Sequence, residues 1–563
     1  MTDPTREKVL SLGDAYFEIA HSTDPYTATV LGVTGFDDAT PDPRRGASEE
    51  ALRRLALVEA ELASVPEPTD LATRVDKEVL SALVFGMATE HRHRLWEANA
   101  SAASYAAPQA MAFQSVPVAV VRTKEAVDAY ESRLGALGGY FAGIVESFRL
   151  AQAEGRFSTR VGVAQAIEQL DGHLAQGAAG DAFINVPLPP ELDTPSQRAR
   201  FENIVSRSVW PEMRRLRAVL ADEMAPNARP DDAVGIGHVE GGAAGYLDAV
   251  RKHTTTTMGP EEIHQVGLGV LEALEEEWKR IGQAALGESD IQVIYRRLRE
   301  DPALRFTTTN EIVQVVQSAL ERATEAVPRF FPERTIADCV IEEISPIEAG
   351  NAPLAYYRPP SEDGSRPGAH CVLTAQPELR YRYEYEALAF HESIPGHHLQ
   401  IATSQAVPSI PRFRRYLDAE VCGFVEGWGL YSERLADEMG LYSSDLARLG
   451  MLSFDALRAC RLVVDTGMHY YGWSRQKAMD FMWSHTATTE ANVRNEIDRY
   501  IAWPGQALAY MIGRRHIVSE RRRAEAALGD RFDIRAFHDV ALGNGAVPLA
   551  VLSTIVDDLI VRG

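Results

Sequence analysis

Length, composition and charge limit what this chain can be. At 563 residues it exceeds the usual size of a single compact core, so we expect at least two lobes with a cleft between them. A formal net charge of −23 would repel a phosphate backbone, which excludes a nucleic-acid partner. The four cysteines form no C-x-x-C pair, so we expect reduced thiols rather than a disulfide framework or a cysteine-based zinc site.

The N-terminal residues and the hydropathy pattern predict a cytoplasmic protein with no membrane partner. Residues 1–7 lack the basic and apolar regions of a signal peptide. No uninterrupted apolar run approaches the length needed to cross a bilayer. These observations leave the oligomeric state open.

Helical periodicity runs through most of the chain and predicts a mainly α protein. The clearest helical segments are 49–62, 124–151, 194–224, 260–281 and 310–326. Proline and glycine interrupt the pattern at 225–245, which marks a boundary between lobes. We therefore expect an N-terminal helical lobe at 1–240 and a C-terminal catalytic lobe at 241–563.

A small β-sheet is expected at about 339–374, before the metal motif described next. Short runs with β character lie at 339–344, 355–358 and 370–374, separated by turns rich in proline and glycine. An edge strand at this position could pair with an extended peptide, whereas a purely structural hairpin is the alternative.

The motif His-Glu-Ser-Ile-Pro-Gly-His-His at 391–398 is the most informative feature of the chain. It resembles the helical zinc motif H-E-x-x-H, in which two histidines bind the metal and the glutamate acts as general base on water. Here Pro395 occupies the place of the second histidine, so the helix must bulge, kink or restart. We expect His391 to be a ligand and Glu392 the base. The second ligand is His397 or His398, and His397 is favoured because removing the Pro-Gly insertion restores the motif.

The third protein ligand is predicted to be Glu426, at the start of Glu-Gly-Trp-Gly-Leu-Tyr-Ser-Glu. Helical projection places Glu426 opposite an apolar stripe, on a second face that is also small or apolar, so the carboxylate is expected to be buried. Gly427 and Gly429 lower helix propensity, as expected where another group approaches closely. A bound metal explains both features, and a salt bridge to an arginine is the alternative. We expect about one Zn²⁺ per chain, with water in the fourth position.

A helix is also expected at 454–472, with Arg458, Arg461, Asp465 and His469 close to one face. An exposed charged stripe is one interpretation. The other is a stripe that lines the cleft. In that case His469 could donate to a tetrahedral oxyanion, and an arginine could bind a substrate carboxylate in a bidentate manner.

Several motifs together resemble the bacterial domain-of-unknown-function family numbered 885, which is grouped with zincin-type peptidases whose third ligand is glutamate. The resemblance covers nearly the whole chain and implies a mainly helical, cleft-forming hydrolase similar to oligopeptidases and carboxypeptidases with long channels. The motifs that carry it lie at 246–257, 391–400, 426–433, 465–469, 499–510 and 537–545. It also implies that the segment of Tyr500 and Tyr510 supplies a phenol beside the metal, without deciding which tyrosine; packing is the alternative for either.

These patterns predict a zinc metallohydrolase, and specifically a peptidase that acts on short peptides or on their C-termini. One alternative is a zinc-dependent hydrolase of a non-peptide amide or ester, because the motifs describe the chemistry of the carbonyl and not of its flanking groups. Another is a metal-containing protein that binds a ligand without hydrolysing it. The natural substrate and the choice between exopeptidase and endopeptidase action are left open.

Overall fold

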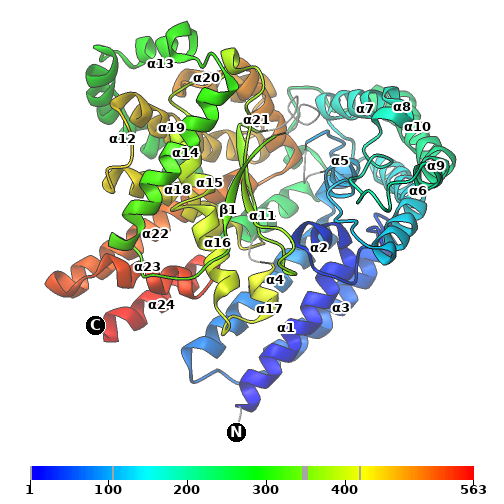
Figure 1. The fold of residues 1–563 in the computed structure, drawn as a ribbon, viewed down its shortest axis with the longest axis horizontal. Coiled ribbons are helices and arrows are strands. Elements are labelled where there is room, and N and C mark those ends of the chain that lie inside the picture. The colour runs from blue at the N-terminus through cyan, green and yellow to red at the C-terminus, as the bar shows by residue number, and fades with distance from the viewer. Residues whose placement is uncertain (1–2, 104–106, 345–352, 418–419, 563) are drawn as a thin grey trace.

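Helices dominate the structure, and one small sheet lies in the C-terminal half of the chain (Figure 1). The computed structural model describes residues 3–103, 107–344, 353–417 and 420–562. The expected fold class, a mainly α protein with a small sheet before the metal motif, is confirmed.

Within the residues described, the regular elements of the N-terminal part are all helices. Its helices are α1 (Pro4–Thr23), α2 (Pro25–Leu31), α3 (Arg45–Ser64), α4 (Leu71–His93), α5 (Pro108–Ser115), α6 (Lys124–Ala153), α7 (Arg160–Ala175), α8 (Gly177–Gly180), α9 (Pro195–Ile204) and α10 (Trp210–Ala218). The helical segment expected at 194–224 is present, but π-helical turns at Val205–Val209 and Val219–Met224 interrupt its α-helical hydrogen bonding. Pro211 and Pro226 follow these turns, and a proline removes an N–H and crowds the carbonyl four residues before it.

The C-terminal part holds the sheet and the remaining helices. The helices are α11 (Gly242–Thr254), α12 (Pro260–Leu286), α13 (Ile291–Glu300), α14 (Thr309–Ala326), α15 (Tyr385–Glu392), α16 (His397–Ala406), α17 (Arg412–Arg415), α18 (Cys422–Glu438), α19 (Asp445–His469), α20 (Arg475–His485), α21 (Glu490–Ala502), α22 (Ala509–Leu528), α23 (Ile534–Gly543) and α24 (Leu549–Arg562). None of the helices described is both long and apolar enough to span a membrane.

The sheet has three strands in the order β1-β3-β2, with bounds β1 (Cys339–Glu343), β2 (Ala355–Arg358) and β3 (Gly368–Val372). β1 runs parallel to β3, with Cys339 opposite Gly368, and β2 runs antiparallel to β3, with Ala355 opposite Val372. All of β3 is buried. The sheet expected at 339–374 is therefore present, although residues 345–352 lie outside those described.

Two hydrophobic clusters divide most of the interior. The smaller one joins the helices from α5 to α10 and includes Phe141 and Leu216. The larger one combines α1, α3 and α4 with helices of the C-terminal part, as Leu12, Leu80 and Trp428 illustrate. Figure 1 shows α6 to α10 gathered on one side of the molecule, away from α22 and α24. The first helices thus share a core with the C-terminal part, and the boundary near residue 240 remains a prediction.

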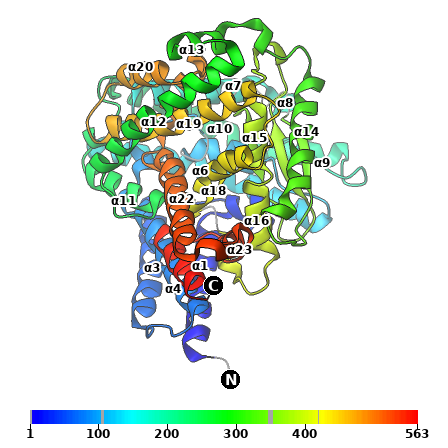
Figure 2. The same cartoon turned by 90° about the vertical axis from the view of Figure 1, so that its left-hand side faces the viewer.

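α19 lies at the centre of the C-terminal part. Every residue from 449 to 469 is buried, so this helix has no solvent-facing side over that length. α12 packs along α19 (Figure 2), and α18 packs along α22. Helices buried on all sides must pair their polar side chains internally, and this requirement shapes the site described next.

Candidate metal centre

The motif at 391–398 folds as two helices joined by a short turn. α15 ends at Glu392, the Ile394–Pro395 peptide bond is cis, and α16 begins at His397. Of the outcomes expected at the proline, the helix restarts. Gly396 is required in the turn, because a Cβ there would lie 1.8 Å from the carbonyl oxygen of His391.

α18 holds this turn in place through the carbonyl of Pro395. The indole Nε1 of Trp428 donates to that oxygen at 2.9 Å, and the hydroxyl of Ser432 donates to it at 3.2 Å. Both donors are buried, so the turn is fixed to the helix that carries Glu426.

The structure brings His391, His397 and Glu426 together, with one donor atom of each within 4.8 Å of the others. Nε2 of His391 lies 3.7 Å from Oε2 of Glu426, and Nε2 of His397 lies 3.5 Å from the same oxygen. Two ligands about 2.1 Å from a tetrahedral zinc ion are about 3.4 Å apart, which is close to both distances. Two imidazoles and a carboxylate also form the donor set typical of catalytic zinc. These residues therefore fit the metal that the sequence predicts.

His398 lies outside this cluster. Its Nδ1 shares a hydrogen bond of 3.0 Å with the hydroxyl of Tyr357 in β2, and burial lowers its pKa to about 4. Of the two candidate histidines, the structure thus places His397 beside His391. The alternative salt bridge between Glu426 and an arginine is not found among the residues described, where its ion-pair partners are the two histidines.

A second carboxylate orients His391 from the opposite side of its ring. Nδ1 of His391 lies 2.8 Å from Oε1 of Glu433, which is fully buried. A proton on Nδ1 leaves the lone pair of Nε2 free and directed at the cluster, as in many metal sites where a carboxylate fixes the histidine tautomer. Glu433 follows Glu426 by two helical turns, and the sequence places both on one face. That spacing could have indicated that Glu433 also faces the metal site, but the hydrogen bond between Glu433 and His391 was not predicted.

Burial and charge determine the protonation of the cluster. Burial alone would lower the pKa of His391, but the carboxylates of Glu426 and Glu433 outweigh it and raise the pKa to about 9. Burial would raise the pKa of Glu426, but the two histidines hold it well below its usual value. The site therefore attracts a positive charge at Nε2 of His391, which a proton or a metal ion can supply.

Gly429 allows the two histidines to approach α18. A Cβ at this position would lie 2.7 Å from Cε1 of His391 and 3.0 Å from Cε1 of His397. Gly427 plays a similar part on another side, where a Cβ would lie 2.6 Å from Cα of Gly513 in α22. Both glycines of the motif are therefore required for close packing, as expected from the sequence.

Glu392, the predicted base, lies at the end of α15 beside the cluster and is partly accessible. Burial raises the pKa of its carboxyl, although the neighbouring His391 and His397 act in the opposite direction. A carboxylate with a raised pKa is a better proton acceptor than an ordinary one, which suits general-base chemistry.

The two candidate tyrosines differ in their surroundings. The ring of Tyr510 lies 6.4 Å from that of His391 and nearly parallel to it. Burial raises the pKa of Tyr510, and Glu426 adds to this effect, so its hydroxyl keeps its proton at neutral pH. The hydroxyl of Tyr500 instead donates to Glu496 and accepts from Nε of Arg461 at 2.7 Å. Of the two, only Tyr510 has an electrostatic contact with a predicted ligand in the part of the chain described.

His469, the other predicted catalytic residue, uses both ring nitrogens to bind backbone. Nδ1 accepts from the N–H of Ile236 at 3.0 Å, which puts the ring proton on Nε2, 2.9 Å from the carbonyl of Tyr500. This bonding leaves His469 no free N–H for an oxyanion. Asp465 is similarly engaged by the hydroxyl of Tyr246 at 2.6 Å and the N–H of Gly505 at 3.1 Å. The expected polar stripe on α19 is present but buried, and only its arginines lie near the cluster.

The chain matches the family described as bacterial protein of unknown function (DUF885) over residues 25–556. It belongs to this family. The crystal structure of a "putative lipoprotein" from Colwellia psychrerythraea is similar over 99% of this chain and 100% of that one, with a TM-score of 0.91 and 26% identity. A "putative lipoprotein of unknown function" from Shewanella oneidensis covers 97% of this chain and 98% of its own, with a TM-score of 0.70 and 18% identity. No curated protein matches the chain.

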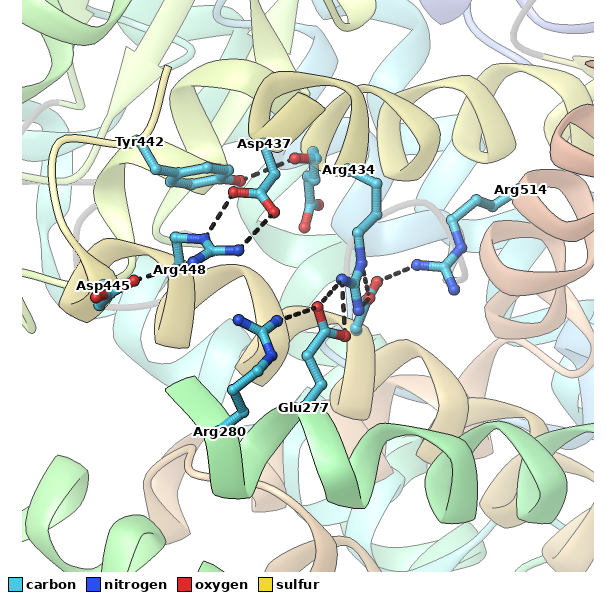
Figure 3. A network of polar contacts seen from close by, with 10 residues as sticks. Glu277, Arg280, Arg434, Asp437, Tyr442, Asp445, Arg448 and Arg514 are labelled. Carbon is cyan, nitrogen blue, oxygen red and sulfur yellow. Dashed lines mark hydrogen bonds and ion pairs between the residues drawn. The ribbon is translucent and has the colours of Figure 1, made fainter. Parts of the chain in front are cut away.

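In this DUF885 protein, a network of ion pairs fixes the helix that carries both Glu426 and Glu433 (Figure 3). Arg434 pairs with Glu277 of α12 at 2.8 Å and also with Asp455 of α19. Arg514 of α22 contacts the same aspartate, which is fully buried. Three helices are thereby tied to α18 at the residue next to Glu433. The sequence did not predict this network, because its members lie far apart in the chain.

Proposed function

We propose that this DUF885 protein is a zinc-dependent hydrolase, and specifically a metallopeptidase of the oligopeptidase or carboxypeptidase kind. The observation that carries the proposal is the convergence of His391, His397 and Glu426, with Nδ1 of His391 bound by Glu433. A structural zinc site is normally closed by four protein ligands, whereas three ligands leave a position for water. The cluster offers three ligands, and the carboxylate of Glu392, the proposed base, lies beside it.

Each residue near the cluster has a role in the proposed reaction. His391, His397 and Glu426 would hold one ion per chain, which when bound would polarise a substrate carbonyl and lower the pKa of water. Glu392 would accept the proton of the attacking water and pass it to the leaving amine. The protonated hydroxyl of Tyr510 would donate to the developing oxyanion.

The likeness to zincins whose third ligand is glutamate belongs to the same proposal. It is supported by a glutamate on a neighbouring helix and by the His-Glu pair at the end of α15. The restart of the helix at His397 sets this chain apart from the unbroken H-E-x-x-H helix. A hydrolase of a non-peptide amide or ester would use the same residues, as would a protein that binds a ligand without hydrolysis.

The expected cytoplasmic location remains a proposal as well. Two solved structures with this fold carry the description "putative lipoprotein", which is the reason to test an exported location for this chain as well. Fractionation of cells that express the full-length gene product decides between the two locations.

One experiment distinguishes a peptidase from a hydrolase of other amides or esters and from a protein that only binds a ligand. The protein is purified without chelator, its metal content is measured, and it is offered a peptide library whose products are identified by mass spectrometry. We expect about one zinc per chain and cleavage of short peptides. Glu392→Gln should keep the metal and lose on the order of a hundredfold or more in kcat, because an amide cannot take the proton. Glu378→Gln, an equal change at an exposed position, serves as the control.

Absence of metal after purification and after reconstitution would refute the metal centre. Full zinc occupancy with hydrolysis of esters or acyl amides, but no cleavage of any peptide, would refute the peptidase and support a hydrolase of non-peptide substrates. Near-normal turnover by Glu392→Gln at full occupancy would remove Glu392 from the reaction.

A further inference from the structure

Two buried arginines of α19 keep hydrogen-bond donors that the protein leaves unused. Arg458 and Arg461 are each 5% exposed. Nε and Nη1 of Arg458 and Nη1 of Arg461 have no hydrogen-bond partner among the residues described. Buried guanidinium donors are normally satisfied, because leaving a charged donor without a partner is costly. Other buried arginines in the described part of the chain have one such nitrogen, but only Arg458 and Arg499 have two, and Arg461 lies close to both. We take this concentration of unused donors as the sign of a ligand.

These arginines lie beside the metal cluster. Nη2 of Arg458 is 3.6 Å from Oε1 of Glu433, the same oxygen that binds His391. The guanidinium of Arg461 lies over the ring of Tyr510, 4.3 Å from its centre, and that of Arg458 lies 6.0 Å from the same ring. Tyr510 in turn lies against His391. The pair thus flanks the side of the cluster where the proposed oxyanion donor stands.

Three arginines gather at this position. Arg458 lies near Glu433, and Arg461 and Arg499 both lie near Glu496. Nε and Nη2 of Arg499 also lack hydrogen-bond partners within the described structure. A guanidinium presents parallel N–H groups that match the two oxygens of a carboxylate.

We propose that Arg458 and Arg461 bind the free C-terminal carboxylate of the substrate, which makes the protein a carboxypeptidase or a peptidase that releases a short C-terminal fragment. The proposal rests on the hydrolase function proposed above. The contacts from His391 to Tyr510 and from Tyr510 to Arg461 span 6.4 and 4.3 Å. The rings of His391 and the guanidinium of Arg461 are therefore at most about 11 Å apart, and because each peptide residue spans at most about 3.3–3.6 Å, about three residues are enough to bridge this gap. Hydrolysis adds water across the amide, so the N-terminal fragment gains a carboxylate and the released fragment a free amine.

The test compares three peptides of one sequence: the free acid, its C-terminal amide, and an amide with a glutamate side chain near the C-terminus. For the wild-type protein we expect kcat/KM for the acid to exceed that for the plain amide on the order of 100-fold, as two charge-assisted hydrogen bonds would give. The ratio is independent of the fraction of active protein, so a partly unfolded variant does not distort it.

Arg458→Gln should reduce this ratio by at least about tenfold through loss of activity on the acid alone, and Arg461→Lys should reduce it less, because the charge remains but the fork is lost. Arg448→Gln is the matched control. Arg448 lies on the same helix but pairs with Asp437 at 2.7 Å and Asp445 at 3.0 Å, so its substitution should leave the ratio unchanged.

A binding measurement gives a readout that does not depend on turnover. An N-acetyl dipeptide and its amide are titrated by calorimetry into zinc-loaded Glu392→Gln protein, and into the same protein with Arg458→Gln added. We expect the acid to bind at least about tenfold more tightly than the amide in the first protein, and the difference to disappear in the second.

The outcomes separate the two proposals. Cleavage of acid and plain amide at equal rates overturns the carboxylate site and leaves the hydrolase intact. Arginine-dependent binding of the acid without cleavage of any peptide supports the carboxylate site and removes the peptidase. A preference for the amide that carries glutamate shows that the arginines bind a side chain, which overturns the C-terminal assignment.

Discussion

Protons and metal ions compete for Nε2 of His391. The neighbouring carboxylates of Glu426 and Glu433 determine how tightly this nitrogen holds its proton. The pKa of His391 is raised from 6.5 to about 9 by Glu426 and Glu433. Metal binding requires the neutral ring at Nε2, so it must release a proton at any pH below about 9. At pH 7, below this pKa, the competition weakens the apparent affinity on the order of 100-fold. We therefore expect the affinity to rise nearly tenfold per pH unit up to about pH 9 and then to level off.

Glu433→Gln is the perturbation that tests this account. The amide oxygen can still accept from Nδ1, but the negative charge is lost, so the pKa of His391 should fall toward 6.5 and proton competition at pH 7 should decrease. The variant also loses the carboxylate that orients and polarises the ligand, which typically weakens metal binding 10- to 100-fold. The two effects oppose each other at pH 7 and only the second remains at pH 9. The zinc affinity of Glu433→Gln should therefore be only slightly lower than that of the wild type at pH 7, and 10- to 100-fold lower at high pH.

The assay is competition with a chelating indicator for Zn²⁺ from pH 6 to pH 10, combined with calorimetry in buffers of different ionisation enthalpy to count released protons. We expect the wild-type protein to release about one proton at pH 7. Glu438→Gln, on the same helix and paired with Arg521 at 2.8 Å near the surface, should follow the wild type. A wild-type affinity that does not change between pH 7 and 9 would refute the reasoning, as would a deficit for Glu433→Gln that is equal at every pH.

Three further substitutions probe the site and its frame. Tyr510→Phe should keep the metal and lower kcat by about 10²–10³-fold as measured by steady-state kinetics, whereas Tyr500→Phe should lower it far less, because that hydroxyl is already bonded to a glutamate and an arginine. Gly429→Ala should weaken zinc binding at least about tenfold in chelator competition, because its methyl group would lie 2.7 Å from the imidazole of His391. The far-ultraviolet circular dichroism should be unchanged, since alanine favours a helix. Normal zinc binding would contradict the packing argument. Asp455→Ala should reduce the free energy of unfolding by about 3–5 kcal/mol in urea denaturation, since it leaves two buried arginine contacts unpaired, and Asp445→Ala, at the exposed end of α19, should change it by less than about 1 kcal/mol.

The parts of the site that the sequence predicted are those encoded by local spacing. His391 and Glu392 follow from a short motif, and the proline between the histidines indicates that the helix cannot continue. The same spacing favoured His397 over His398, and the structure places His397 in the cluster. Helical periodicity also predicted the mainly α fold and the small sheet. At 194–224 periodicity predicted the helical segment but not the π-helical turns within it, because those turns depend on local backbone hydrogen bonding.

The parts that the sequence could not predict depend on contacts between distant helices. Tyr500 and Tyr510 lie on neighbouring helices, and only the packing of α22 against α18 turns Tyr510 toward the cluster. The bond from Glu433 to His391 likewise joins α18 to α15. Periodicity gives the face of a helix on which a residue lies, but not the element that this face meets.

α19 illustrates how an unused hydrogen-bond donor can separate function from packing. Its polar stripe is buried, so each member needs an internal partner. Asp465 and His469 find theirs in backbone and tyrosine groups, which accounts for them without any reaction. Arg461 binds Glu496 and Tyr500 but keeps one nitrogen without a partner among the described residues. Arg458 lies 3.6 Å from Glu433 and keeps two such nitrogens. A stripe that served packing alone would be expected to satisfy all four side chains equally. Within the described structure, the donors left over on this stripe belong to Arg458 and Arg461, the two members nearest the metal ligands, which is where a substrate would supply the missing acceptor.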